Sequence, residues 1–154
     1  MTAQVFLHRP RDFNPTVEAS GVFCEYEGRV LFLKRHAAKI EGLRWGIPGG
    51  KLELGETPIE AAARELAEEA GIASTSSTLK TIASLYVRRP EEDFIFHMFF
   101  LPLQEMPPLQ VAPDEHIEAC WVNLQEGQKL PLISGGKEAL EYFYLWKNDQ
   151  KNVI

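Results

Sequence analysis

Three glutamates close together in the sequence are the residues best suited to chemistry. In an α-helix, Glu65, Glu68 and Glu69 would lie within an arc of about 100°, so they would share one face. Like charges three and four residues apart repel by roughly 0.2–0.5 kcal/mol per pair, and a bound divalent cation would relieve that repulsion. Ligation by oxygen alone favours Mg²⁺ or Mn²⁺ over Zn²⁺, and Mg²⁺ commonly bridges carboxylates to substrate phosphates. The pattern therefore points toward phosphate chemistry.

A solvated acidic surface is the alternative interpretation of these glutamates. Two features count against it. Glu68 and Glu69 fall in the last turn of the expected helix, where the helix dipole disfavours anions. Glu65 and Glu69 have no basic residue three or four positions away, and Arg64 is expected to pair with Glu60 or Glu68. A concentration of uncompensated acids at the wrong end of a helix is typical of a functional site.

The net charge follows the same pattern. The 154 residues carry 16 Lys+Arg against 22 Asp+Glu, a formal net charge of −6. Residues 50–72 hold six of the acids and two of the bases, so this segment carries −4 and the rest of the chain only −2. The acidic balance and the lack of a basic arm argue against a general nucleic-acid binder. The excess of acid marks a local site rather than the whole surface.

The helix that must position the glutamates is well delimited by its sequence. Thr57 is suited to the N-cap, Pro58 to the first helical position, and Glu60 completes a capping box with Thr57. Gly71 is a natural stop after the last turn. A second arc of the helix is apolar and rich in alanine: Ile59, Ala62, Ala63, Leu66 and Ala70. The sequence therefore predicts a helix over residues 57–71 that packs closely against its partner.

The whole segment from Gly50 to Ile72 resembles the Nudix box. The family pattern is Gly-x5-Glu-x7-Arg-Glu-U-x-Glu-Glu-x-Gly-U, in which U is a bulky aliphatic residue. Each fixed position is filled here, by Gly50, Glu56, Arg64, Glu65, Leu66, Glu68, Glu69, Gly71 and Ile72. Nine demanding positions at fixed spacing rarely match by chance.

The resemblance implies a fold, an activity and a cofactor. The expected fold is the Nudix α/β/α sandwich around a mixed β-sheet, formed as one domain over residues 1–154. The expected reaction is hydrolysis of a phosphoanhydride bond in a nucleoside diphosphate linked to another moiety, and it requires Mg²⁺ or Mn²⁺. A homodimer is a further expectation, because dimers are common in the family.

The resemblance also implies roles for individual residues. Glu65, Glu68 and Glu69 would be metal ligands, or one of them the general base. Glu56 and Arg64 would support them through salt bridges, and the carbonyl of Gly49 would complete the metal coordination. The role of a fourth acid outside the box is assigned to Glu115, with an ordinary acidic loop as the alternative.

The substrate's phosphates also need cations. Lys34, Arg35, Lys39 and Arg44 cluster just before the box. One or two of them, with Arg35, Lys39 and Arg44 as the candidates, would clamp phosphate; the alternative is a solubilising strand edge and loop. Trp45, Trp121 and Phe23 could stack on a base, although core packing is the commoner use of such aromatic residues.

The box does not specify the substrate. A compact chain with no added module most resembles the MutT-type nucleoside triphosphate pyrophosphohydrolases. Dinucleoside polyphosphates, nucleotide sugars and RNA 5′ ends remain alternatives, and so does a non-catalytic nucleotide sensor.

The remaining elements follow from hydrophobic patterning and turn residues. Strands are expected over residues 17–26, 29–35, 79–87, 94–103 and 117–122, and a second helix over 135–147. Four prolines between 102 and 113 predict a surface loop. The absence of an apolar run long enough for a membrane span or signal peptide favours a cytoplasmic protein, in which Cys24 and Cys120 stay reduced.

Overall fold

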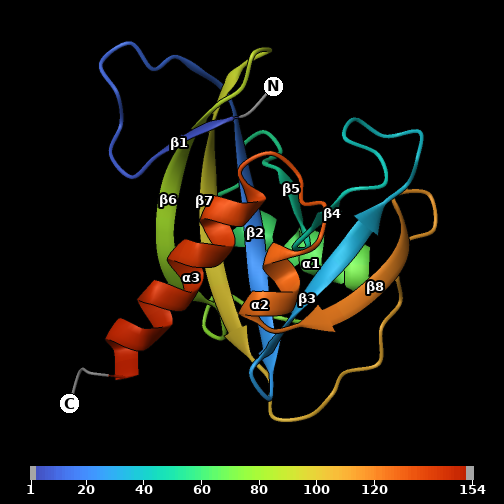
Figure 1. Cartoon of the computed structure of the whole chain (residues 1–154). Coiled ribbons are helices and arrows are strands. Elements are labelled where there is room, and N and C mark those ends of the chain that lie inside the picture. Colours follow the sequence, from blue (N-terminus) through green and yellow to red (C-terminus); the bar gives the residue numbers. More distant parts are fainter. Residues whose placement is uncertain (1–2, 152–154) are drawn as a thin grey trace.

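The sheet at the centre of the molecule carries helices on both of its faces (Figure 1). The structure, a computed structural model, describes residues 3–151. Its strands are β1 (Gln4–Phe6), β2 (Pro15–Tyr26), β3 (Arg29–Arg35), β4 (Trp45–Gly46), β5 (Gly49–Lys51), β6 (Lys80–Arg88), β7 (Asp93–Pro102) and β8 (His116–Val122). Its helices are α1 (Pro58–Ala70), α2 (Leu124–Gln128) and α3 (Gly136–Lys151). The predicted α/β/α sandwich is confirmed.

The sheet is mixed because its two central strands run parallel. The strand order is β1-β6-β7-β2-β3-β4, with β5 paired to β2 and β8 paired to β3. β2 and β7 are the parallel pair, and the other pairings are antiparallel. The short β5 therefore lies beside β2, in front of α1, and carries the first residues of the box to the centre of the molecule.

Two hydrophobic clusters hold the three layers together. On one face of the sheet, Leu66 and Ala70 of α1 pack with Val22 of β2 and Leu33 of β3. On the other face, Phe143 of α3 stacks on Phe23 of β2, with ring centroids 4.4 Å apart. Alternate residues of β2 thus serve opposite cores, as the two-residue period of a strand requires.

The limits of α1 agree with its capping signals. The Thr57 side chain accepts a hydrogen bond from the Glu60 backbone N–H, and the Glu60 carboxylate accepts one from the Thr57 N–H. Gly71 adopts a left-handed conformation with φ 72°, which glycine reaches without the steric cost of a Cβ. The Ser20 hydroxyl of β2 donates to the Pro58 carbonyl at 2.7 Å and fixes the start of the helix against the sheet.

The other predicted elements are present with small shifts at their ends. β3 has the predicted limits, and β7 begins one residue before and ends one residue before the predicted strand over 94–103. Four short elements were not predicted: β1, β4, β5 and α2. Cys24 is buried and Cys120 half-buried, and both are free thiols. No helix among residues 3–151 is long and apolar enough to cross a membrane. The predicted domain limits of 1–154 include a few terminal residues outside the described range.

Candidate active site

Glu69 is the most deeply placed of the three glutamates. It lies in the last turn of α1, is only 5% exposed, and accepts a hydrogen bond from the Gly49 N–H of β5 at 2.8 Å. Burial raises the pKa of Glu69 to about 8, and the nearby carboxylates of Glu65 and Glu115 act in the same direction. The Gly49 N–H and the more distant Arg35 only partly oppose this rise. Little positive charge therefore compensates the Glu69 carboxylate when it is ionised.

Glu65 lies one turn earlier, against the backbone of β5. A Cβ placed on Gly50 would come within 2.6 Å of the Glu65 carboxyl group, so only glycine at position 50 allows this contact. Burial raises the pKa of Glu65 above its usual value, although the Arg64 guanidinium opposes the rise. The glycine that begins the box therefore lets the Glu65 carboxyl group lie directly against the backbone of β5.

Arg64 joins the preceding loop to the helix. It donates to Glu56 at 2.7 and 2.9 Å, to Glu65 at 2.9 Å and to Glu68 at 3.2 Å. It also donates to the Lys51 carbonyl at 3.1 Å. Hydrogen bonds from Arg64 lower the pKa of Glu56 to about 2, so this carboxylate stays ionised.

The partners expected for Arg64 from helix spacing were only partly right. Its pairing with Glu68 is confirmed, and the alternative with Glu60 is wrong, because Glu60 turns back to cap the helix start. Spacing on a helix could not reveal Glu56, which lies in the loop before α1. Glu68 itself has a side chain that is 59% exposed, so it faces solvent more than its two neighbours do.

The loop between β7 and β8 closes the C-terminal end of α1 and brings Glu115 near. The Gln110 N–H donates to the Ala70 carbonyl at 2.9 Å, and the Ala112 N–H donates to the Glu69 carbonyl at 3.3 Å. Glu115 contributes to the raised pKa of both Glu65 and Glu69, which indicates that it lies close to them. Its carboxylate is 3.8 Å from the Lys39 ammonium.

The donor set suits a hard divalent ion in type. Only oxygen donors are offered, by three carboxylates on one helix face beside a glycine-rich strand. Among residues 3–151, however, no three acidic, histidine or cysteine side chains converge closely enough to hold an ion as they stand. Arg64 engages Glu65 and Glu68, while Gly49 uses its N–H on Glu69. The metal-ligand roles of Gly49, Glu65, Glu68, Glu69 and Glu115 stay predictions.

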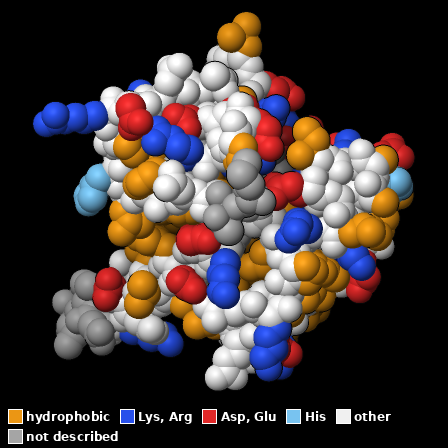
Figure 2. Space-filling model, turned by 45° about the horizontal axis from the view of Figure 1, so that its top comes forward, with side chains coloured by type: hydrophobic (Ala, Val, Ile, Leu, Met, Phe, Trp, Pro, Cys, Tyr) orange, Lys and Arg blue, Asp and Glu red, His pale blue; other side chains and the backbone are white. Residues whose placement is uncertain are grey.

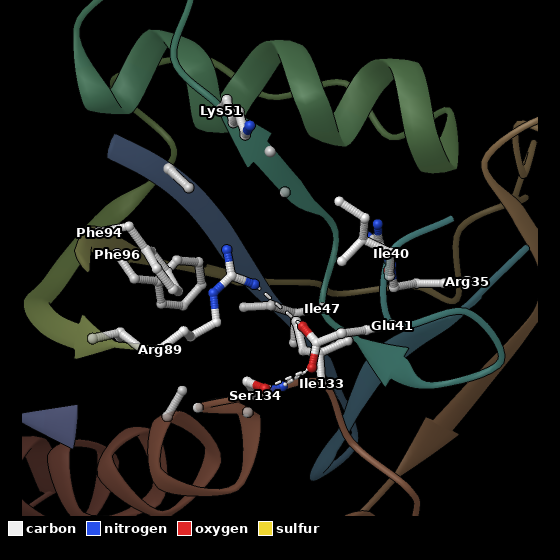
Figure 3. A pocket seen from close by; sticks show the side chains of 18 of the residues that line it. Arg35, Ile40, Glu41, Ile47, Lys51, Arg89, Phe94, Phe96, Ile133 and Ser134 are labelled. Carbon is white, nitrogen blue, oxygen red and sulfur yellow. Dashed lines mark hydrogen bonds and ion pairs between the residues drawn. The ribbon is translucent and has the colours of Figure 1, made fainter. Parts of the chain in front are cut away.

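A pocket of about 250 Å³ opens beside this cluster. Charged side chains of both signs lie among hydrophobic ones on the face shown in Figure 2. At one end the pocket is lined by β5, from Gly49 to Lys51, and by Arg35. At the other end Arg89 reaches toward Glu41, which in turn contacts Ser134 (Figure 3). The walls between are largely apolar and include Val17, Phe94, Phe96, Ile47 and Ile133.

The predicted phosphate-binding residues divide into two groups. Arg35 lines the pocket, and its Nε donates to the Ile40 carbonyl at 2.8 Å. Lys39 pairs with Glu115, and Arg44 donates to the Leu132 carbonyl at 3.2 Å; neither is among the residues that line the pocket. Lys51, which does line it, was not among the candidates. The phosphate roles remain predictions.

The sequence did not predict the end of the pocket that Glu41, Arg89 and Ser134 form. Glu41 meets Arg89 and Ser134, which lie 48 and 93 positions away along the chain. No local sequence pattern connects residues so far apart. Of the aromatic residues considered for stacking, Phe23 stacks on Phe143 in the core and also lines the pocket, together with Phe94 and Phe96, which were not considered.

Comparison with known proteins shows the family. The model of the NUDIX domain matches residues 14–143, so the chain belongs to the Nudix family. Among structures, it superposes on a MutT protein from Methanosarcina mazei Go1 with a TM-score of 0.74 at 23% identity, covering 89% of this chain and 96% of that one. A bifunctional NMN adenylyltransferase/ADP-ribose pyrophosphatase from Francisella tularensis, solved with AMP and a manganese ion, gives a TM-score of 0.68 at 21% identity. The superposition covers 89% of this chain and 43% of the Francisella tularensis chain.

The similar sequences carry different names. An ADP-ribose pyrophosphatase of Bacillus subtilis (strain 168) is 34% identical over 108 residues, 68% of this chain and 56% of the relative. An 8-oxo-dGTP diphosphatase of Proteus vulgaris is 46% identical over 61 residues, 40% of this chain and 54% of the relative. A CTP pyrophosphohydrolase of Escherichia coli (strain K12) is 26% identical over 82% of this chain and 90% of its own length. The matches to the first two thus span just over half of each relative.

Proposed function

We propose that this protein hydrolyses a phosphoanhydride bond in a nucleoside diphosphate derivative, with the help of Mg²⁺ or Mn²⁺. The observation that carries the proposal is the buried Glu69, with its raised pKa, beside a pocket bounded by the same strand that contacts it. The favoured substrate is a nucleoside triphosphate, cleaved by water to a nucleoside monophosphate and pyrophosphate. Relatives named for nucleotide pyrophosphatase activity support this choice.

Phosphoanhydride hydrolysis is slow because the substrate's own anions repel the attacking water and charge accumulates on the leaving phosphate. A divalent ion, when bound, neutralises phosphate oxygens and lowers the pKa of a coordinated water. In the proposed arrangement, Glu68 and Glu69 hold the ion, with the Gly49 carbonyl and Glu115 as further ligands. Glu65 either ligates the ion or orients the attacking water.

The remaining residues position these groups. Arg64 and its ion pair with Glu56 fix the end of the loop against α1, so that Glu65 and Glu68 stay on one side of the helix. Arg35 and Lys51 at the near end of the pocket supply positive charge for the substrate's phosphates. The apolar walls exclude water from the nucleoside, which leaves its phosphates at the carboxylate end.

A substrate screen with charge-neutral variants tests the proposal. Nucleoside triphosphates, oxidised deoxynucleotides, dinucleoside polyphosphates, nucleotide sugars and ADP-ribose are incubated with Mg²⁺ or Mn²⁺, and products are identified by chromatography. Glu68→Gln and Glu69→Gln should each lower kcat by about a hundredfold or more, because each removes a charge from the reacting centre.

The matched control is Glu60→Gln on the same helix. It removes one negative charge, but glutamine can still complete the capping box, so turnover should stay near that of the unmodified protein. Near-normal turnover in both Glu68→Gln and Glu69→Gln would refute the proposed roles of these two glutamates. A metal-independent activity would sink the proposed use of the ion.

A further inference from the structure

The end of the pocket farthest from β5 holds a carboxylate in largely apolar surroundings. Glu41 projects from the loop between β3 and β4 toward Ile47 and Ile133, and its side chain is 23% exposed (Figure 3). Burying a charged group beside apolar walls is costly unless it finds partners. A charge in this position does not serve to keep the surface soluble, so the groups that it binds must explain it.

The two oxygens of Glu41 are used unequally. Oε1 accepts hydrogen bonds from the Ser134 N–H at 2.8 Å and from the Ser134 hydroxyl at 2.6 Å, which occupy both of its lone pairs. Oε2 has one long contact, to Arg89 Nη1 at 3.4 Å. One oxygen is thus anchored to the protein, and the other retains capacity for a stronger donor.

Arg89 does not depend on that long contact for its position. Its Nη2 donates to Glu92 at 2.6 Å, and its guanidinium lies over the Phe94 ring, 4.7 Å from the centroid. Its buried Nε has no hydrogen-bond partner among the described residues.

The backbone of the loop supports a fixed role for Glu41. Glu41 has φ 55°, a left-handed conformation that costs energy for a residue with a Cβ, and Leu43 has φ 64°. The loop is tied down by Arg35, which donates to the Ile40 carbonyl, and by the contacts of Glu41 with Ser134. Strain at a residue that also lines a pocket is typical of a binding site.

We propose that Glu41 reads the nucleobase: its Oε2 accepts a hydrogen bond from an exocyclic amino group, so the pocket selects amino-bearing bases over bases with a carbonyl at that place. This inference rests on the proposed function, because it assumes a nucleotide with its phosphates at the β5 end. A carbonyl oxygen placed against Oε2 would meet a negative charge and leave Oε2 without a donor, and an unmet hydrogen bond in a closed site is costly. Cytosine is favoured over uracil on this ground, and adenine over hypoxanthine.

The test compares bases that differ at a single group. The ratio of kcat/KM for CTP over UTP should be about tenfold or more, as expected for one hydrogen bond to a charged group. Glu41→Gln replaces an acceptor with a donor beside the pocket and should bring the ratio to one or below, with kcat/KM for UTP held or raised. If Glu41 had only a structural role, the substitution would lower kcat/KM for CTP and for UTP by the same factor. Glu138→Gln, an exposed charge on α3 outside the pocket lining, should leave the ratio unchanged.

Binding without catalysis separates this inference from the proposed function. Calorimetric titration of CMP, UMP, AMP and IMP in EDTA should show tighter binding of CMP than UMP and of AMP than IMP, with the preference lost in Glu41→Gln. Such a preference without hydrolysis of any nucleotide would refute the proposed function and leave the role of Glu41 standing. Equal binding within each pair, or binding of none of the four, would overturn the role of Glu41 even if nucleotides are hydrolysed.

Discussion

The two ends of α1 are built on opposite principles. At its start, Thr57 and Glu60 satisfy each other's backbone groups, Pro58 occupies the first position, and an acid lies where the helix dipole favours it. At its end, Glu68 and Glu69 lie where the dipole disfavours them, and the last turn has no basic residue. The first end contributes stability, and the second costs it.

The difference separates the part of the helix that stabilises the fold from the part that costs stability. The β7–β8 loop satisfies the C-terminal end of α1, because the N–H groups of Gln110 and Ala112 donate to the last carbonyls of the helix. The protein leaves the Glu69 carboxylate of that end without comparable neutralisation: Glu69 has one N–H donor, and its pKa is raised to about 8. Local rules of helix design are kept where nothing is bound and broken where a ligand is expected.

Gly50→Ala should have the largest effect of the changes that probe this contrast. Its Cβ would come within 2.6 Å of the Glu65 carboxyl, so Glu65 must move away from β5. Displacing a reacting group by about 1 Å can cost on the order of a hundredfold in rate. Steady-state kinetics should show that loss in kcat, and a thermal melt should show a protein that still folds cooperatively. A rate within twofold of the unmodified protein would mean that Glu65 has no fixed position to lose.

Glu69→Gln should stabilise the metal-free protein at alkaline pH. The pKa of Glu69 rises from 4.5 to about 8 on folding, so the folded state holds its proton more tightly than the unfolded state does. The associated stability is present in full below pH 4.5 and is lost as the pH rises toward 8. In EDTA at pH 8, the variant should exceed the unmodified protein by about 2 kcal/mol in the free energy of unfolding.

The pH dependence provides the control for this stabilisation. At pH 5 the carboxyl is largely protonated in the folded state, so urea titrations should show a much smaller gap between the two proteins. A gap of the same size at pH 5 and pH 8 would show that ionisation of Glu69 is not its source.

Thr57→Ala should have the smallest effect and should leave chemistry alone. It removes the side chain that accepts the Glu60 N–H, a loss of about 1 kcal/mol, or roughly 2–4 °C in Tm for a domain of this size. Turnover at 25 °C should be unchanged, and Thr57→Ser should recover most of the stability because serine also caps. If Thr57→Ala lowers kcat strongly at a temperature where the protein is folded, the two ends of α1 are not independent.

The sequence predicted α1 well because its limits depend on local signals. Thr57, Pro58 and Gly71 act on the backbone within a few residues of themselves, so their effect can be read without knowing the fold. The sharing of one helix face by Glu65 and Glu69 follows from helical spacing in the same way. The longer strands, each of at least seven residues, were found because they are rich in hydrophobic and other β-forming residues and are bounded by turn residues.

What the sequence could not give are relations between distant segments. Helical spacing pairs Arg64 with Glu60 or Glu68 and does not reveal Glu56, which lies in the loop before α1; only the resemblance to the Nudix box named Glu56 and Arg64 as salt-bridge residues. Glu41, Arg89 and Ser134 meet only because β3, β7 and α3 surround one space. The strands β4 and β5, of two and three residues, are set by pairing with β3 and β2 and have no pattern of their own.

The parallel pairing of β2 with β7 has a consequence for how the protein is made. Residues 17 to 25 of β2 pair with residues 94 to 102 of β7, so the middle of the sheet is joined across more than seventy intervening residues. The hairpin of β2 and β3 can form as soon as it leaves the ribosome, whereas the pairing of β2 with β7 must wait until residues 94 to 102 have been made. The last turn of α1 is completed later still, because the N–H groups that donate to its carbonyls belong to Gln110 and Ala112. A nascent chain therefore carries the complete box well before it has the strand and the loop that hold the box in place.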